Sequence, residues 1–314
     1  MSDASQRDIA VRRPWAVGLL TILAIMLGVP TVVVAQRDFS KVEIKTTDLG
    51  DGLAMLQGAG GNIGVSTGKD GVFLIDDQYA PLTEKILVAI RALSKEDVRF
   101  VLNTHWHGDH TGGNENLGQA GALIFAHQRV RARVSTEQYR AITDQKIPAS
   151  PEIGWPVVTF EDGVTLHLNG QTIEAIHVEP AHTDGDSIVY FHEADLLHMG
   201  DTYFAGVYPF IDTSSGGEID GMIAAADRGL AIAGPETRII PGHGPLSNRA
   251  ELEATRNMLA SIRDRVLKLI ENGQTRDQVI AAKPTKDHDE VYGGGFIKPD
   301  AFAGIVYDGL EKQK

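Results

Sequence analysis

The sequence predicts an α+β fold in which two β-sheets pack face to face and helices cover their outer sides. Three observations predict this fold. Short β-rich runs separated by glycine turns fill residues 41 to 75, and a second series of such runs fills residues 157 to 200. Segments with helical periodicity follow each series. No linker divides the chain between them, so we expect one domain over residues 36 to 314.

The first half of the chain is expected to contain strands, a helix, further strands and a second helix. Pro81 suits the first turn of a helix, and apolar residues recur behind it at nearly helical spacing. Short apolar runs after this helix are typical of buried strands. The expected elements are strands within residues 41 to 75, a helix over 81 to 93, strands over 98 to 104 and 122 to 127, a helix over 128 to about 139, and a proline-bearing loop over 146 to 156.

The second half is expected to contain a series of strands and then helices. The turn sequences EDG, NG and HEA separate the strands. A helix that ends at Asn272 and Gly273 has a favourable C-cap. The expected elements are strands within residues 157 to 200, a short apolar run over 238 to 240, and helices over 218 to 233, over 249 to 271 and from about 299.

The charge and the cysteine content limit the classes of function. The chain has 29 Lys and Arg against 42 Asp and Glu, a formal net charge of −13, so its average field repels a polyanion and no nucleic-acid partner is expected. It has no cysteine, which excludes disulfides and thiolate metal ligands. Any bound metal is therefore held by nitrogen and oxygen.

The N-terminal segment predicts export. Arg12 and Arg13 form a basic region before an apolar run over residues 15 to 34, and small residues ending at Ala35 form a cleavage-like site. We therefore interpret residues 1 to 35 as a signal peptide. The apolar run is also long enough to span a bilayer, so a retained anchor is the alternative. In both cases the body of the protein is expected in the periplasm or outside the cell, with membrane contact only through this segment.

The most informative stretch is NTHWHGDHTGG, which begins at residue 103. It places His105, His107, Asp109 and His110 within six positions, directly after a predicted strand. Histidines two positions apart in a loop can direct both imidazoles at one centre. A zinc site needs three or four nitrogen or oxygen ligands, and a catalytic one keeps a position open for water. The remaining ligands must therefore come from later in the chain.

The side chains that complete such a site follow three later β-rich runs. His182 stands in PAHTDGDS, Asp201 in LLHMGDTYF and His243 in IIPGHGPL. Each lies close to a glycine, where a sharp turn can aim a side chain over the edge of a sheet. Four loops are therefore expected to converge.

The motifs HWHGDH, HTDGD, GDTYF and PGHG, in this order and spacing, resemble those of the metallo-β-lactamase superfamily. The resemblance covers about residues 50 to 247, and it implies a four-layer αββα sandwich with two zinc ions at its edge. It assigns one zinc ion to His105, His107 and His182, and the other to Asp109, His110 and His243. It also implies that Asp201 bridges the two ions, as in the thioesterase and lactonase branches of the family.

This resemblance implies a hydrolytic mechanism on a small-molecule acyl substrate. Two zinc ions lower the pKa of water to about 7 and polarise a carbonyl oxygen. Asp109 is expected to act as the catalytic carboxylate, which orients the nucleophile and carries its proton towards the leaving group. The histidine at position 107 favours zinc, because the di-iron branch of the family carries a carboxylate there.

Three functions remain open for the implied site. The first is β-lactamase-like cleavage of a β-lactam amide by an exported enzyme. The second is hydrolysis of a lactone, a thioester or another acyl compound, among which a glutathione thioester is disfavoured because export separates the enzyme from that cytosolic substrate. The third is zinc binding without catalysis, which seven intact ligand positions disfavour.

The residues around Asp201 bear on this choice. The best-known β-lactamases of the family carry cysteine or serine at that position, and one subclass has a lysine three positions later, where this chain has Phe204. No Lys or Arg occurs from residue 201 to residue 227. Tyr203, Ser214 or Ser215 would then have to hold the carboxylate of a β-lactam.

The remaining histidines and Asp76 have no motif around them. We expect the histidines at positions 127, 167, 177, 192, 198 and 288 to occupy ordinary strand or surface positions. Asp76 follows the apolar run VFLI, and we expect it to close a turn and support the loop of the first motif. A direct contact between Asp76 and a metal ligand is the less favoured alternative.

Overall fold

Two β-sheets lie face to face at the centre of the computed structural model, which describes residues 38–312. The first sheet has the order β1-β2-β3-β4-β5-β6-β9 and the second β10-β11-β12-β13-β14-β15. The strands of the first sheet are β1 (Lys45–Gly50), β2 (Leu53–Gln57), β3 (Ile63–Ser66), β4 (Val72–Ile75), β5 (Val98–Asn103), β6 (Leu123–His127) and β9 (Val158–Phe160). Those of the second are β10 (Gly163–Leu168), β11 (Gln171–His177), β12 (Ser187–Phe191), β13 (Leu196–His198), β14 (Arg238–Ile240) and β15 (Ser247–Asn248).

Each sheet begins as an antiparallel meander, which three parallel pairs follow in the first sheet and one parallel pair follows in the second. Strands β1 to β4 pair antiparallel, and β4, β5, β6 and β9 then pair parallel. In the second sheet β10 to β13 are antiparallel, β13 and β14 are parallel, and β15 returns antiparallel. Parallel neighbours end at the same edge of a sheet, so the segments that leave β5, β13 and β14 can meet there.

The alternation of side chains along the strands builds two layers of core at once. In β4, Phe73 and Ile75 face the second sheet, where the ring of Phe73 lies 6.4 Å from that of Phe191. The neighbouring side chains Val72 and Leu74 point to the opposite side and pack beneath a helix. Successive strand residues face opposite sides of the sheet, so both sides of β4 are buried.

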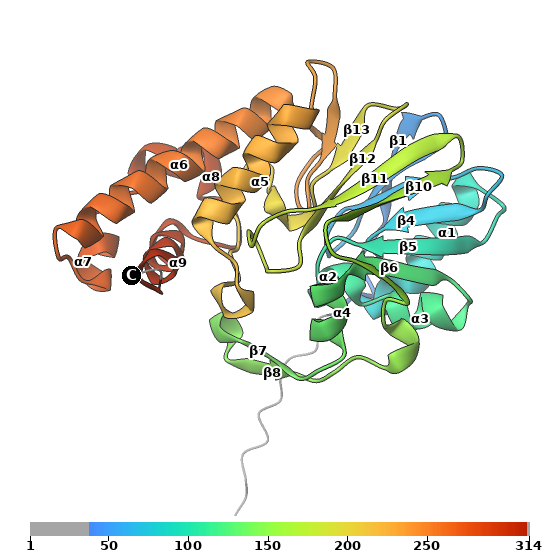
Figure 1. Cartoon of the computed structure of the whole chain (residues 1–314), viewed down its shortest axis with the longest axis horizontal. Coiled ribbons are helices and arrows are strands. Elements are labelled where there is room, and N and C mark those ends of the chain that lie inside the picture. The colour runs from blue at the N-terminus through green and yellow to red at the C-terminus, as the bar shows by residue number, and fades with distance from the viewer. Residues whose placement is uncertain (1–37, 313–314) are drawn as a thin grey trace, which may run out of the picture. The chain divides into compact units, whose positions relative to one another are not determined.

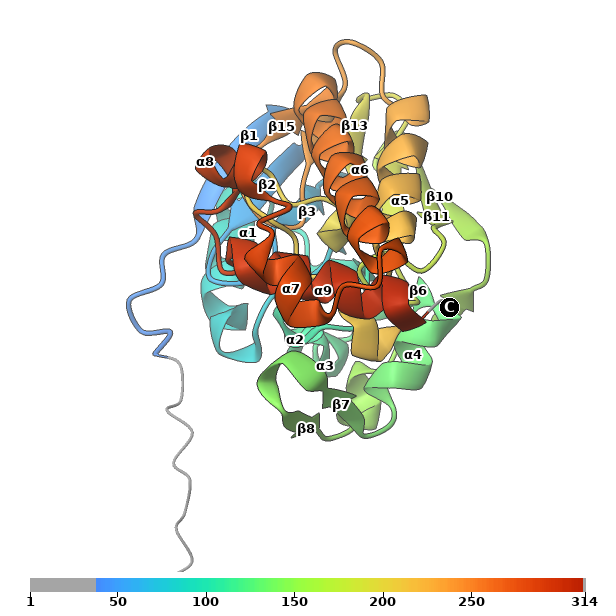
Figure 2. The ribbon, with the colours of Figure 1, turned by 90° about the vertical axis from the view of Figure 1, so that its left-hand side faces the viewer.

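Helices cover the two outer faces, as Figure 1 shows, and complete the four layers. Helices α1 and α3 lie on the first sheet and α5 and α6 on the second, whereas α9 packs against α5, α6 and α7. Figure 2 shows α9 across the lower end of α6 and beside α7. The helices are α1 (Thr83–Leu93), α2 (Gly108–Thr111), α3 (Asn114–Gln119), α4 (Gln128–Val134), α5 (Ile219–Ile232), α6 (Arg249–Glu271), α7 (Arg276–Ala281), α8 (Asp289–Tyr292) and α9 (Pro299–Lys312). The predicted αββα fold is confirmed.

The prediction of a helix over residues 128 to 139 was wrong at its end. Helix α4 stops at Val134, and the hydroxyls of Ser135 and Thr136 donate back to the carbonyl of Ala132. Residues after this point form a hairpin of β7 (Gln138–Arg140) and β8 (Gln145–Ile147), so part of the predicted loop over 146 to 156 is a strand. Short hydroxyl side chains compete for backbone groups and end a helix locally.

Several short helices lie where the sequence analysis predicted no helix. Helix α2 carries part of the histidine motif, and α3 follows it directly. Helix α7 begins with a capping box, in which Thr275 and Gln278 satisfy each other's backbone groups. The T-x-x-Q pattern is therefore a sequence signal for α7 that the periodicity analysis missed.

The described residues from Phe39 onward form one compact unit. Within residues 38–312, no helix has the length and apolar character needed to cross a bilayer. The predicted signal peptide, residues 1 to 35, lies outside the described residues.

Candidate metal centre

Four segments at one edge of the sandwich bring the seven predicted ligands together. They are the segments after β5, after β11, after β13 and after β14. The donor atoms fall into two groups, and within each group they lie within 4.8 Å of one another. The first group is His105, His107, His182 and Asp201, and the second is Asp109, His110 and His243.

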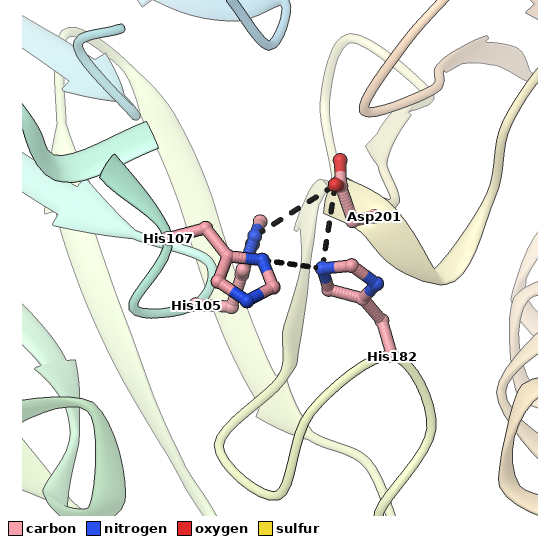
Figure 3. A group of neighbouring side chains, drawn as sticks. All are labelled: His105, His107, His182 and Asp201. Carbon is pink, nitrogen blue, oxygen red and sulfur yellow. Dashed lines mark hydrogen bonds and ion pairs between the residues drawn. The ribbon is translucent and has the colours of Figure 1, made fainter. Parts of the chain in front are cut away.

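The first group converges on one point, as Figure 3 shows. The Nδ1 atom of His107 lies 2.8 Å from Nε2 of His182. Oδ2 of Asp201 lies 3.4 Å from Nε2 of His182 and 3.7 Å from Nε2 of His105. Three imidazole nitrogens and one carboxylate oxygen therefore face a common centre.

The second group lies on the other side of Asp201. Its Oδ1 atom is 3.1 Å from Nε2 of His110 and 3.4 Å from Nε2 of His243. Oδ2 of Asp109 lies 3.4 Å from Nε2 of His243. The two oxygens of Asp201 thus face the two groups separately, which places this carboxylate between them.

The His182 loop is held by the carboxylate of Asp186. This carboxylate accepts the backbone amides of His182 and Thr183 at 2.7 and 2.8 Å, and also the hydroxyl of Thr183. The motif HTDGD therefore stabilises its own turn, because the carboxylate of Asp186, its last residue, holds the backbone that positions His182, its first residue.

Two glycines allow the chain to approach the donor atoms closely. A Cβ atom at Gly61 would overlap the ring of His110, and one at Gly242 would overlap Oδ1 of Asp201. Only glycine fits at these positions without moving a predicted ligand. The glycine of PGHG that precedes His243 thus has a steric role beside Asp201.

The outward nitrogens of His107 and His182 are fixed by one segment. His107 Nε2 donates to Oδ2 of Asp212 at 2.9 Å, and His182 Nδ1 donates to the carbonyl of Phe210 at 2.7 Å. A proton on the outer nitrogen leaves a lone pair on the inner one, which a metal ion requires. These contacts set the tautomers of both rings.

Asp76 fixes the other two imidazoles of the motif. It adopts a positive φ of 64°, and its carboxylate accepts from the amide and the hydroxyl of Thr104 at 2.7 and 2.8 Å. His110 Nδ1 donates to Asp76 Oδ2 at 2.7 Å, and Thr104 Oγ1 lies 3.1 Å from His105 Nδ1. Asp76 therefore closes the turn as expected and also contacts a predicted ligand directly, the alternative that the sequence disfavoured.

Sequence reasoning missed Asp212 and the carbonyl of Phe210. Asp212 caps a 3-10 turn, Thr213–Ser215, by accepting from the amides of Ser214 and Ser215. The pattern D-T-S-S signals such a cap, but nothing local indicates its contact with a histidine 105 positions away. A backbone carbonyl leaves no trace in the sequence at all.

The protonation states suit a metal ion. Burial lowers the pKa of His105 well below its usual value and also lowers the pKa of His107 and of His182, which keeps these rings neutral. Burial opposes the ionised form of Asp201, but the charges of His110 and His243 hold its pKa well below the usual range. Neutral imidazole and ionised carboxylate are the forms that bind metals.

The second group concentrates negative charge. Burial opposes a charge on His243, yet the carboxylates of Asp201 and Asp109 raise its pKa to about 9. The potential that holds a proton there also favours a metal cation.

Two buried donor atoms face charged neighbours of the cluster but make no hydrogen bond with a described residue. His105 Nε2 and Asp201 Oδ1 are buried and make no hydrogen bond with any residue from 38 to 312. Buried polar atoms are normally satisfied, so unpaired atoms that face a cluster of donors indicate a missing ligand. The donor set, all nitrogen and oxygen, fits a metal ion.

The sequence profile of the metallo-beta-lactamase superfamily matches residues 57–251. This range contains all four motifs, and the αββα fold agrees with it. The chain belongs to the metallo-β-lactamase superfamily.

Curated relatives in this superfamily are distant. A hydroxyacylglutathione hydrolase from Synechococcus sp. is 36% identical over 129 residues, which are 39% of this chain and 43% of that protein. The lactamase-like protein aptB from Emericella nidulans is 25% identical over 207 residues, 66% of this chain and 59% of that protein. The 2,4-dinitroanisole O-demethylase subunit alpha from Nocardioides sp. is 26% identical over 249 residues, 76% and 70% of the two chains. This chain spans about half the length of the first two.

Solved structures share the superfamily fold. The DIM-1 metallo-β-lactamase superposes with a TM-score of 0.56 at 21% identity, over 70% of this chain and 99% of that one. The inverting sec-alkylsulfatase Pisa1 from Pseudomonas sp. superposes with a TM-score of 0.64 at 16% identity, over 84% of this chain and 50% of that one. At these identities the likeness concerns the fold alone.

The other histidines lie outside both donor groups of the described chain. His198 is buried in β13, where Nε2 lies 3.2 Å from the carbonyl of Asn62 and Nδ1 accepts from the amide of Gly200. His127 and His177 stack with ring centroids 3.7 Å apart. These contacts are those of strand residues packed in the fold.

Proposed function

We propose that this member of the metallo-β-lactamase superfamily is a dinuclear zinc hydrolase that cleaves an ester or thioester bond of a small acyl compound. The position of Asp201 carries the proposal, since its two oxygens face two separate groups of donors. A carboxylate so placed is suited to bridge two cations. Two cations held there would supply Lewis acidity to one bound carbonyl group.

The donors divide naturally between two zinc ions. His105, His107 and His182 would hold one ion, while Asp109, His110 and His243 would hold the other. Asp201 would contribute one oxygen to each. Zinc suits such sets of nitrogen and oxygen ligands, and it supplies Lewis acidity that acidifies water and polarises a carbonyl.

The two aspartates differ in exposure, which gives them different roles. The side chain of Asp201 is 5% exposed and that of Asp109 is 25% exposed. Asp109 is therefore the carboxylate that a substrate and solvent can reach. Burial opposes its ionisation, but His110 and His243 keep its pKa below the usual value, so the carboxylate is ionised and can accept a hydrogen bond from water. In the proposed reaction Asp109 would pass the proton of that water to the leaving group.

The surroundings of Asp201 support an ester or thioester over a β-lactam. The side chain of Phe204 lies flat against His243, with ring centroids 5.1 Å apart and an angle of 16° between the planes. An aromatic ring at this position offers no charge to a drug carboxylate. The curated relatives named hydroxyacylglutathione hydrolase support thioester cleavage, whereas the likeness to solved β-lactamases concerns the fold.

The hydroxyls proposed to replace a lysine in β-lactam binding already make hydrogen bonds within the protein. Tyr203 is buried and its Oη lies 2.7 Å from Ser247 Oγ. Ser215 Oγ donates to Asp212 at 2.6 Å, and Ser214 Oγ donates to the same carboxylate. β-Lactam cleavage, the first choice from the sequence, therefore becomes the second candidate.

Export remains part of the proposal. The basic and apolar segment that ends at Ala35 supports an enzyme that works in the periplasm or outside the cell, on a small molecule that reaches that compartment.

The test is a hydrolysis panel on the chain from Gln36 onward. Protein purified without chelators is expected to contain about two zinc ions per chain and to hydrolyse S-acyl thioesters or lactones faster than β-lactams. His192→Ala provides a matched control, because this exposed histidine pairs with Glu174 away from the donor groups. Less than one metal ion per chain, or a preference for β-lactams, would contradict the proposal.

A further inference from the structure

A pocket of about 250 Å³ lies beside the metal centre, between the β7–β8 hairpin, the segment 210–214 and the C-terminal helices α7 and α9. Figure 1 shows the hairpin below the short segment that leads into α5. Ala141 and Ile142 of the hairpin line the pocket, with Phe210, Ile211 and Ile305. Ligand sites commonly measure about 300–1,000 Å³, so this pocket suits one part of a substrate.

One wall of the pocket is the segment that fixes two predicted zinc ligands. The ring of Phe210 lies 5.9 Å from that of His107, nearly parallel to it, and 5.6 Å from that of His182. Asp212 also lines the pocket, and its Oδ2 accepts from His107 Nε2. Phe210 and Asp212 therefore contact both the pocket and the first donor group, so a group bound in the pocket is separated from the predicted ligands His107 and His182 by a single layer of side chains.

The pocket presents no unpaired charge among its lining residues. Arg276 Nε donates to Asp308 Oδ1 at 2.8 Å, so these two charges satisfy each other. Asp212 is engaged by His107 and by the serines of its turn. The apolar lining residues Ala141, Ile142, Phe210, Ile211 and Ile305 offer an aliphatic group a surface to cover, whereas the charged residues of the lining already pair with one another or within their own turn.

The hairpin adds apolar surface that a ligand could cover. Ile142 is 42% exposed and Tyr139 is 51% exposed, both on the same hairpin. The hairpin is tied to the wall of the pocket, because the amide of Ala141 donates to Ser214 Oγ at 3.3 Å. An aliphatic group in the pocket would bury part of Ile142 and gain hydrophobic stabilisation.

We propose that this pocket binds an uncharged aliphatic branch of the substrate and makes the enzyme selective for acyl compounds with a medium-length alkyl chain. The inference rests on the proposed function, because it names the substrate class of the same site.

Kinetics on an ester series tests the selectivity. Zinc-loaded protein would be assayed with 4-nitrophenyl acetate, butyrate and octanoate, in the wild type, in Ile142→Trp and in Val88→Trp. Val88 is the matched control, because it is 62% exposed on α1. We expect Ile142→Trp to raise KM for the octanoate about tenfold, or about 1.4 kcal/mol, and to leave kcat/KM for the acetate within about twofold. Ile142→Leu, which keeps an aliphatic side chain, should leave KM for the octanoate close to the wild-type value.

Calorimetry with octanamide tests binding apart from catalysis, because this probe is uncharged and resists rapid hydrolysis. Wild type and Val88→Trp are expected to bind octanamide about tenfold more tightly than Ile142→Trp. If this difference is seen but no ester or thioester is cleaved, the pocket stands and the proposed function fails. If kcat/KM for the esters does not depend on chain length, and Ile142→Trp binds octanamide as tightly as the wild type, the pocket proposal is overturned. The proposed hydrolase function is not affected by that result.

Discussion

Replacing Asp212 by asparagine should weaken zinc binding, although Asp212 is not one of the predicted zinc ligands. Oδ1 of Asp212 caps the turn by accepting from the amides of Ser214 and Ser215, and Oδ2 accepts from His107 Nε2 at 2.9 Å. Asparagine has one acceptor oxygen, and the cap takes it. The amide nitrogen of asparagine then faces His107 Nε2. Both nitrogens carry hydrogens, so the hydrogen bond between residues 107 and 212 is lost.

The expected loss follows from the hydrogen bond that is removed. A bond to a charged acceptor contributes about 1.5–3 kcal/mol, which corresponds to roughly a 10- to 150-fold change in affinity. To avoid the clash, the ring of His107 must move its proton to Nδ1, the nitrogen that faces the first donor group. We expect zinc affinity to fall about 10- to 100-fold, the range typical of residues that orient a ligand.

Competition with a chromophoric chelator at constant pH would measure the zinc affinity. Thermal unfolding of the metal-free protein would show that the cap survives, since asparagine is also a good N-cap residue. Asp227→Asn is the matched control, because this half-exposed carboxylate pairs with Arg256 on the surface, where an ion pair contributes little. Zinc affinity of Asp212→Asn within about twofold of the wild type would refute the tautomer argument.

Three further outcomes are expected. His182→Ala should abolish hydrolysis yet keep cooperative unfolding, because its loop lies at the edge of the sandwich; loss of the unfolding transition in calorimetry would instead make the metal structural. Phe204→Lys should lower KM for β-lactams more than it raises kcat, and it should leave thioester turnover nearly unchanged. The prediction is contradicted if the wild type already has a micromolar KM for carbapenems and Phe204→Lys does not lower it. Burial, with the charges of His177 and Arg129, lowers the pKa of His127 to about 4, so the folded state binds fewer protons than the unfolded chain. Its stability contribution is therefore complete above pH 6.5 and is lost as the pH falls towards 4. In urea titrations of the metal-free protein, the wild type should lose about 1–2 kcal/mol more than His127→Gln between pH 7 and pH 4.5, and equal losses would count against this.

Local patterns were enough to predict most of the sandwich. Strand β4 was predicted from an apolar run between turns, and α6 from its helical periodicity and its end at Asn272 and Gly273. Both predictions succeed because burial and capping depend on a few neighbouring residues. The β7–β8 hairpin after α4 was missed for the opposite reason. Residues 138–140 pair with residues 145–147, and neither stretch carries a strand pattern of its own.

The sequence by itself predicted the side chains that the structure gathers at the candidate metal centre. Histidine and aspartate at fixed spacing after strands, beside glycines that permit sharp turns, leave few alternatives to a metal site, and the absence of cysteine restricts its ligands to nitrogen and oxygen. Only the tertiary structure decided which nitrogen of each ring faces the centre. The contact between His107 and Asp212 joins residues 105 positions apart, and the pocket joins the β7–β8 hairpin to α9. Such contacts depend on how distant segments pack, and short-range sequence patterns carry no record of that packing.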